Sequence, residues 1–327
     1  MTDLPTDTVL DAIAARRAER RNFLRYAGGA AASAGGLALL AACGNDGDSP
    51  TPTPTPTASA TPIAADADIL NFALNLEYLE AQFYSWAAFG QALPSGLTTG
   101  IGTPGAVTGG AAVAFSDPIV AQYAREIALD EVQHVSFLRS VLGGFAVAMP
   151  AINIAGDATG AFTAAARAAG VVGATGVFNP YADDISFLLG AYLFEDVGVS
   201  AYKGASPLIG NKTFIEAAAG ILATEGYHAG LIRSVLYRKG IDAAAVFTNA
   251  RLISDARDSL DGSSDIDQGI GDATTANIVP TDATGLAYSR SSGQVLNIVY
   301  LNKAAVASGG FFPSGINGNI RTSAASG

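Results

Sequence analysis

Two short segments, Glu131-Val-Gln-His134 and Glu225-Gly-Tyr-His228, contain the only two histidines of this 327-residue chain. In both, the histidine follows a glutamate by three residues. On an α-helix this spacing puts both side chains on one face, so each segment presents one carboxylate and one imidazole together. A histidine taken alone is more often an ordinary core or surface residue. The repeated spacing instead predicts two helices that hold two metal ions between them.

A two-metal site of this kind needs one further glutamate from each of two other helices. Two segments, LEYLEAQFY and FEDVGVSAY, fit this requirement, and each places a tyrosine seven residues after a glutamate. Seven residues make about two helical turns, so Glu77 shares a face with Tyr84, and Glu195 shares a face with Tyr202. The two segments therefore predict the remaining ligand helices.

The helices that carry the histidines also repeat beyond the ligands. Arg139 and Arg233 each follow a histidine by five residues, in the segments HVSFLRSVL and HAGLIRSVL. The chain is therefore interpreted as an internal duplication, with two helix pairs related by a pseudo-twofold axis. We expect Tyr84 and Tyr202 to hydrogen-bond to ligands or pass electrons, or else to pack as ordinary buried tyrosines. The arginines are expected either to neutralise carboxylates or to lie at the surface.

From about Ile69 to Gly240 these motifs resemble the ferritin-like superfamily. They are most similar to its branch of exported bacterial ferritin-like domain proteins, which also contains plant desiccation-related proteins. The resemblance implies an all-α fold: a ferritin-like four-helix bundle with one long crossover over residues 66–240. Extra helices and irregular loops of a C-terminal extension, residues 241–327, would pack on it. The resemblance implies that Glu77 and Glu195 are terminal carboxylate ligands. It implies that Glu131 and Glu225 are bridging carboxylates, and that His134 and His228 are terminal imidazole ligands.

Four further residues of the ligand helices stand out. Glu80 lies one turn after Glu77, where it is an additional or alternative ligand, or else an exposed helix residue. Gly198, Gly226 and Gly230 are unusual because glycine in a helix costs about 1 kcal/mol relative to alanine. A close approach between helices would explain these glycines.

The expected elements follow from hydrophobic periodicity, caps and glycine stops. A Gly/Thr-rich loop or short hairpin is predicted over 96–110. A crossover over 144–180, with a short helix near 161–169, is long enough to let the helices on either side run parallel. The predicted long helices span 68–89, 118–143, 181–203 and 212–238, and two further helices span 242–260 and 293–303.

Residues 1–43 have the features of an export signal. Arg20-Arg21 resembles a twin-arginine motif, and the apolar run that follows is too short for a membrane span. The run ends in Leu-Ala-Ala-Cys43, which resembles a bacterial lipoprotein cleavage box, and a buried structural cysteine is the alternative. Residues 44–65, rich in Thr and Pro, predict a disordered linker. We therefore expect a periplasmic or cell-envelope lipoprotein of a bacterium, held to the membrane through lipidated Cys43.

The net charge and the numbers of cysteines and histidines exclude several classes of function. A net charge of −11 argues against nucleic acid as a partner. With one cysteine in the chain, an internal disulfide and a rubredoxin-type iron site are excluded. No histidine is left for a Ser-His-Asp or Cys-His nucleophile system. Any chemistry therefore belongs to the metals.

Oxygen and imidazole ligands suit two Fe or two Mn ions, and Zn also has affinity for them. The leading hypothesis is an exported di-metal oxidoreductase that reacts with O2 or peroxide, in a ferroxidase-like or catalase-like reaction. A lipid anchor and long extensions disfavour a storage cage, whereas a homodimer is compatible with them. The alternative from another class is a stress- or desiccation-associated structural protein that binds metal without turnover.

Overall fold

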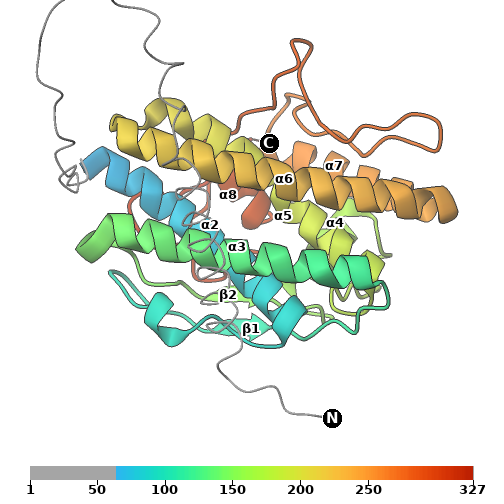
Figure 1. The fold of residues 1–327 in the computed structure, drawn as a ribbon, viewed down its shortest axis with the longest axis horizontal. Coiled ribbons are helices and arrows are strands. Elements are labelled where there is room, and N and C mark those ends of the chain that lie inside the picture. Colours follow the sequence, from blue (N-terminus) through green and yellow to red (C-terminus); the bar gives the residue numbers. More distant parts are fainter. Residues whose placement is uncertain (1–63, 327) are drawn as a thin grey trace, which may run out of the picture. The chain divides into compact units, whose positions relative to one another are not determined.

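The computed structural model describes residues 64–326 (Figure 1). Cys43 and the rest of the expected signal, with nearly all of the 44–65 linker, lie outside these residues. The expectations of export and lipidation therefore stay predictions. Between residues 64 and 326, no helix combines the length and apolar character needed to cross a membrane.

Four long helices form the bundle as two packed pairs. α2 (Ala64–Phe89) packs mainly on α3 (Pro118–Leu142), and α5 (Asp184–Ala205) packs mainly on α6 (Lys212–Asp242). The predicted all-α fold and its four main helices are confirmed. α2 begins four residues earlier than predicted, and α6 continues four residues further.

Capping side chains determine where α3 and α5 begin. Asp117 accepts a 2.9 Å hydrogen bond from the backbone N–H two residues later, immediately before Pro118 opens α3. Asp183 accepts a 2.7 Å hydrogen bond from the backbone N–H three residues later. Such caps satisfy N–H groups that have no partner within the helix. The second cap starts α5 at Asp184, three residues after the predicted start at Tyr181.

The crossover between α3 and α5 carries β2 (Ile152–Ile154) and α4 (Ala161–Ala169), and α3 and α5 run in the same direction (Figure 1). β1 (Val107–Gly109), which precedes α3, pairs in parallel with β2. A hairpin within residues 96–110, one of the two expectations, therefore does not form. Gly109 permits the pairing, because a Cβ there would lie 2.3 Å from the backbone of the crossover.

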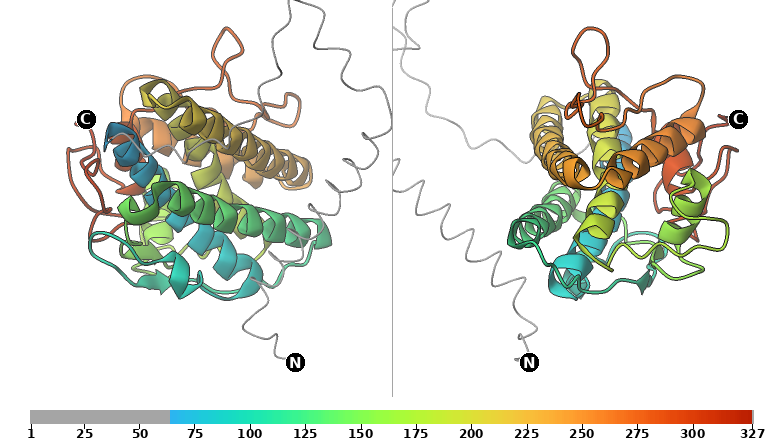
Figure 2. Two further views of the ribbon diagram at one scale, coloured as in Figure 1. Left: turned by 60° about the vertical axis from the view of Figure 1, so that its left-hand side comes forward. Right: turned by 90° about the vertical axis from the view of Figure 1, so that its right-hand side faces the viewer.

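The C-terminal extension packs on the second helix pair. α7 (Ala245–Asp261) contacts α4, α5 and α6, and α8 (Ser292–Val299) contacts α5 and α7 (Figure 2). α8 ends four residues before the predicted Lys303, because Leu301 adopts a φ of 54°, which an α-helix does not contain. The tail from residue 309 is irregular, in agreement with the irregular loops expected in the C-terminal extension. Single-turn 3₁₀ helices cover Ser95–Leu97, Gly143–Phe145 and Ser206–Leu208.

Candidate metal centre

A first ligand group is assembled from α2, α3 and α6. It consists of Glu77, Glu131, His134 and Glu225, and one ligand atom of each lies within 4.8 Å of the others. His134 Nδ1 is 3.2 Å from Glu77 Oε2 and 3.3 Å from Glu131 Oε2. The same nitrogen is 3.8 Å from Glu225 Oε1. Three of the four helices thus direct their predicted ligands at one point.

A second group consists of Glu131, Glu195 and His228. His228 Nδ1 lies 3.0 Å from Glu131 Oε1 and 3.6 Å from Glu195 Oε2. Glu131 belongs to both groups and turns one oxygen toward each histidine, as a bridging carboxylate does. Glu225 belongs to the first group, so its expected bridging role stays a prediction.

The six side chains are buried and leave several polar atoms without partners. Both oxygens of Glu131, both oxygens of Glu225, and His228 Nδ1 have no hydrogen-bond partner. Buried carboxylates without compensation are strongly unfavourable. Two ligands bound to one ion at 2.0–2.2 Å lie roughly 3 Å apart, which is the separation of His228 Nδ1 and Glu131 Oε1. The cluster is therefore consistent with a site for two metal ions.

Two buried tyrosines connect the halves of the centre. Tyr84 OH on α2 donates a hydrogen bond to Glu195 Oε1 on α5. Tyr202 OH on α5 donates one to Glu77 Oε1 on α2. Each tyrosine thus holds the outer glutamate of the opposite helix pair, so the structure shows one of the expected roles, the hydrogen bond to a candidate ligand.

Glu80 and Gly198 lie beside the cluster. Glu80 is 6% exposed, which excludes the alternative of an exposed helix residue. A Cβ at Gly198 would lie 2.2 Å from Glu225 Oε2 and 3.5 Å from Glu80 Oε1, so glycine there makes room for the Glu225 carboxylate. Close approach does not explain Gly226 and Gly230, because a Cβ at either would meet nothing within 4 Å.

Burial and crowding of charge shift the pKa values of the cluster. Burial raises the pKa of Glu77 to about 7, against the opposing effect of the His134 imidazole. Burial and the neighbouring Glu80 raise the pKa of Glu225 well above its usual range. Burial acts in the same direction on Glu131, but the contacts with the two histidines hold its pKa below the usual range. Without metal, the cluster therefore retains protons that metal binding would release.

The two arginines lie outside the ligand layer and differ in their surroundings. Arg139 is half-buried, and its Nη1 donates to Tyr78 OH (2.6 Å) and to Thr99 O (2.5 Å). Arg233 is fully buried, and its Nη1 forms an ion pair with Asp196 Oδ2 at 2.7 Å. In the described part of the chain, neither arginine pairs with a candidate ligand. The expected neutralisation of ligand carboxylates is therefore not seen.

Asp130 is a site residue that the sequence reasoning missed. Its Oδ2 lies 3.5 Å from His228 Nε2, while Nδ1 of the same ring faces the cluster. A carboxylate on the outer ring nitrogen orients a metal-binding imidazole. The first half thus supplies an outer partner for a histidine of the second half. The available signal was an acidic residue directly before Glu131.

A four-helix bundle with carboxylates and histidines converging in its core defines the ferritin-like class. A family model described as a ferritin-like domain matches residues 65–238, and the chain belongs to this family. The chain is 29% identical to the ferritin-like catalase Nec2 of Nesocodon mauritianus over 269 residues, which cover 78% of this chain and 85% of that protein. It is 30% identical to the desiccation-related protein PCC13-62 of Craterostigma plantagineum over 247 residues, which cover 71% of this chain and 76% of that protein. No solved structure matches the chain.

Proposed function

We propose that this chain is a di-iron or di-manganese oxidoreductase that disproportionates hydrogen peroxide, so that two molecules of peroxide give two of water and one of dioxygen. The observation that carries the proposal is the pair of buried ligand groups that share Glu131. The relation to a protein named as a ferritin-like catalase supports peroxide over O2 as the substrate. A ferroxidase-like reaction with O2 would use the same ligands and is tested beside it.

Bound Fe or Mn would supply redox chemistry, which Zn in the same site would not. The protein's own residues provide orientation and a proton. Tyr84 and Tyr202 hold the outer carboxylates through hydrogen bonds between the helix pairs. Burial, and then the nearby Glu131, raise the pKa of Glu80 well above its usual range. Glu80 therefore keeps a proton at a pH where an ordinary glutamate has lost it, and is suited to exchange that proton with a reacting molecule.

The size of the approach to the centre supports a small neutral substrate. A narrow pocket of about 20 Å³ lies between α2, α5 and α6. Half-exposed Ile69 and Leu76 line it, and so do Glu80, Gly198 and Tyr202 beside the ligands. A space of about one water volume with an apolar lining admits peroxide or O2 and disfavours hydrated ions.

The test measures metal content and turnover of the full-length chain, loaded separately with Fe(II) and Mn(II) without oxygen. We expect about two ions per chain and release of O2 from peroxide, both lost in a His134→Ala/His228→Ala double variant. Oxidation of Fe(II) by O2 without peroxide turnover would move the assignment to a ferroxidase. Bound metal with neither reaction would overturn the oxidoreductase proposal.

The second candidate is a desiccation-associated structural protein with bound metal. It is favoured by the relation to a protein named as desiccation-related. A strain that lacks the chain would then survive peroxide normally but lose viability on drying. The same strain made sensitive to peroxide alone would favour the enzyme.

We further propose, from the sequence alone, that a bacterium exports the chain by the twin-arginine route and holds it in the periplasm or cell envelope through lipidated Cys43. A homodimer is compatible with this arrangement. Cell fractionation and the mass of the mature N-terminus test the proposal. An unmodified Cys43 in a cytoplasmic fraction would contradict it.

A further inference from the structure

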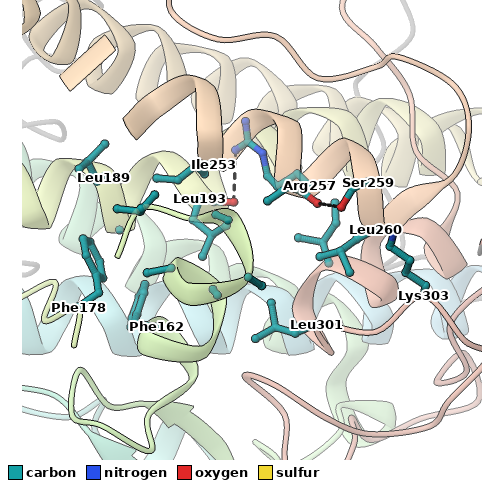
Figure 3. Close-up of a pocket in the computed structure, with 18 residues that line it drawn as sticks. Phe162, Phe178, Leu189, Leu193, Ile253, Arg257, Ser259, Leu260, Leu301 and Lys303 are labelled. Carbon is teal, nitrogen blue, oxygen red and sulfur yellow. Dashed lines mark hydrogen bonds between the residues drawn. The ribbon is translucent and has the colours of Figure 1, made fainter. Parts of the chain in front are cut away.

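A second, larger cavity shares no residue with the two ligand groups. Its volume is about 300 Å³, and its walls come from α5, α7, and the helices α4 and α8 with the chain that follows each of them (Figure 3). This volume reaches the lower end of the range found for small-molecule sites. One side of the cavity is built by the C-terminal extension, which supplies none of the candidate metal ligands.

The lining of this cavity is apolar along most of its length. Phe162, Phe178 and Leu189 lie toward one end in Figure 3, and Leu301 lies further along. Lys303 lies at the opposite end. The cavity is therefore hydrophobic over its length with a cationic group at one end.

The other polar side chains of the lining already have partners. Arg257 donates hydrogen bonds to Asp196 Oδ2 (2.8 Å) and Asp267 Oδ1 (2.5 Å), which balance its charge. Ser259 Oγ donates to a backbone carbonyl of its own helix at 2.8 Å. Lys303 is exposed and forms no ion pair within residues 64–326. Its ammonium group is therefore the charge that remains available to a ligand.

We propose that this cavity binds a medium-chain aliphatic carboxylate, with its tail against Phe162, Phe178 and Leu189 and its carboxylate at Lys303. At ~30 Å³ for each water-sized group, the cavity holds about ten non-hydrogen atoms, which matches a ten-carbon chain whose two carboxylate oxygens lie at the open end beside Lys303. An apolar tail with an anionic head complements both ends of the cavity. The site does not depend on the proposed oxidoreductase function, because no metal ligand takes part in it.

The experiment compares decanoate, decanol and decylamine by titration calorimetry on the full-length, delipidated chain. Decanoate should bind most tightly and decylamine most weakly. Lys303→Gln should weaken decanoate about threefold and leave decanol unchanged, as expected for an exposed ion pair. Lys212→Gln, at an exposed lysine that begins α6, is the matched control and should change neither.

Filling the cavity gives a second test of the same site. Ala165→Phe changes a half-exposed lining residue of α4 and should abolish binding of both decanoate and decanol, with thermal unfolding as the check on folding. Equal affinity for decanoate and decanol would overturn the proposal, and so would decanoate binding that survives both substitutions. A dimer that dissociates on Ala165→Phe, with no ligand binding, would make the cavity a contact between copies of the chain instead.

Discussion

In both helix pairs, the arginine five residues after the histidine contacts the residue that follows the outer glutamate. Arg139 contacts Tyr78 in the first pair, and Arg233 contacts Asp196 in the second. The two contacts are equivalent in position, but the partner of the arginine is uncharged in the first pair and negatively charged in the second. The repeated pattern therefore extends one layer beyond the candidate ligands, and the residue that the arginine contacts changes from an uncharged tyrosine to a charged aspartate.

The difference between Tyr78 and Asp196 corresponds to the different segments that cover the two helix pairs. Tyr78 OH donates to Val147 O of the crossover (3.1 Å), and Arg139 reaches the loop at Thr99. The first contact therefore attaches two covering segments through hydrogen bonds to uncharged acceptors. Asp196 also pairs with Arg257 of α7 at 2.8 Å. A buried ion network then continues through Asp267, Arg290 and Asp261. Equivalent positions of the two helix pairs thus attach different covering segments on the two sides of the candidate metal centre.

A similar contrast separates Glu80 from Gly198, which occupy equivalent positions three residues after the outer glutamates. The first pair adds a buried carboxyl group, and the second leaves a space that the Glu225 carboxylate fills. The ligand core is therefore not fully symmetric. At this position, only the first pair contributes a carboxyl group.

The largest expected effect is loss of the shared carboxylate. Glu131→Ala should reduce bound metal from about two ions per chain to about none, because Glu131 belongs to both ligand groups. Glu77→Ala should release one ion, since it belongs to the first group alone. Elemental analysis measures both, with Glu216→Ala, at an exposed position on α6, as the control. Equal losses in the Glu131 and Glu77 variants would break the division into two groups.

The next effect separates the outer layers of the two pairs. Asp196→Asn leaves Arg233 and Arg257 buried beside a neutral group, and should lower the free energy of unfolding by about 3–5 kcal/mol. Tyr78→Phe removes one hydrogen bond to an uncharged backbone carbonyl and one from the half-buried Arg139. The free energy of unfolding should therefore fall by only about 1–2 kcal/mol. Urea unfolding of the full-length variants measures both. Similar losses would contradict the contrast.

A pH series tests the ligand core apart from its coverings. Burial raises the pKa of Glu77 to about 7, so the folded chain holds a proton there that the unfolded chain releases at lower pH. Stability present below the unfolded pKa is therefore lost as pH rises through 7. The metal-free chain should melt at a lower temperature at pH 7.5 than at pH 5.5. Glu77→Gln should reduce this difference, and a dependence of the opposite sign would contradict the argument.

Asp130 and Thr224 precede the two histidine motifs at equivalent positions. Asp130 contacts His228, whereas Thr224 Oγ1 donates to a backbone carbonyl of its own helix at 3.2 Å. Asp130→Asn should weaken metal affinity about tenfold for the second group, by loosening the orientation of its imidazole. Thr224→Ala should leave affinity unchanged. Competitive chelator titrations measure the metal affinity of both variants. Equal effects would contradict a difference between Asp130 and Thr224.

The smallest effect concerns the glycines of the second pair. Gly226→Ala and Gly230→Ala should each stabilise the chain by up to about 1 kcal/mol, because the added methyl groups meet no neighbour. Gly198→Ala should instead displace the Glu225 carboxylate and reduce metal content. Thermal melts and elemental analysis distinguish these outcomes. A loss of stability at Gly226 and Gly230 would mean that the helix needs them.

The residues that gather in the candidate metal centre could be predicted because histidine is rare in this chain and the spacing of each motif is repeated. The two histidines identify α3 and α6, and the Glu-to-Tyr interval of seven identifies α2 and α5. Helical periodicity then converts spacing into a shared face.

The outer contacts could not be predicted in the same way. Arg257 meets Asp267 through an irregular segment without periodicity, and β1 meets β2 across an entire helix. Such pairs depend on the path of the chain in space. The bond from Asp130 to His228 crosses between helix pairs, so its partner is likewise absent from the local pattern.

The crossed bonds of Tyr84 to Glu195 and of Tyr202 to Glu77 make neither half self-sufficient. If one helix pair were separated from the other, its tyrosine hydroxyl and its outer glutamate would both lose their hydrogen-bond partners, which lie on the other pair. A chain divided within the crossover should therefore yield two fragments that reassemble with each other. The two crossed bonds have the pattern of contacts that two copies of one helix pair would make about a twofold axis, so each pair supplies the partner that the other lacks.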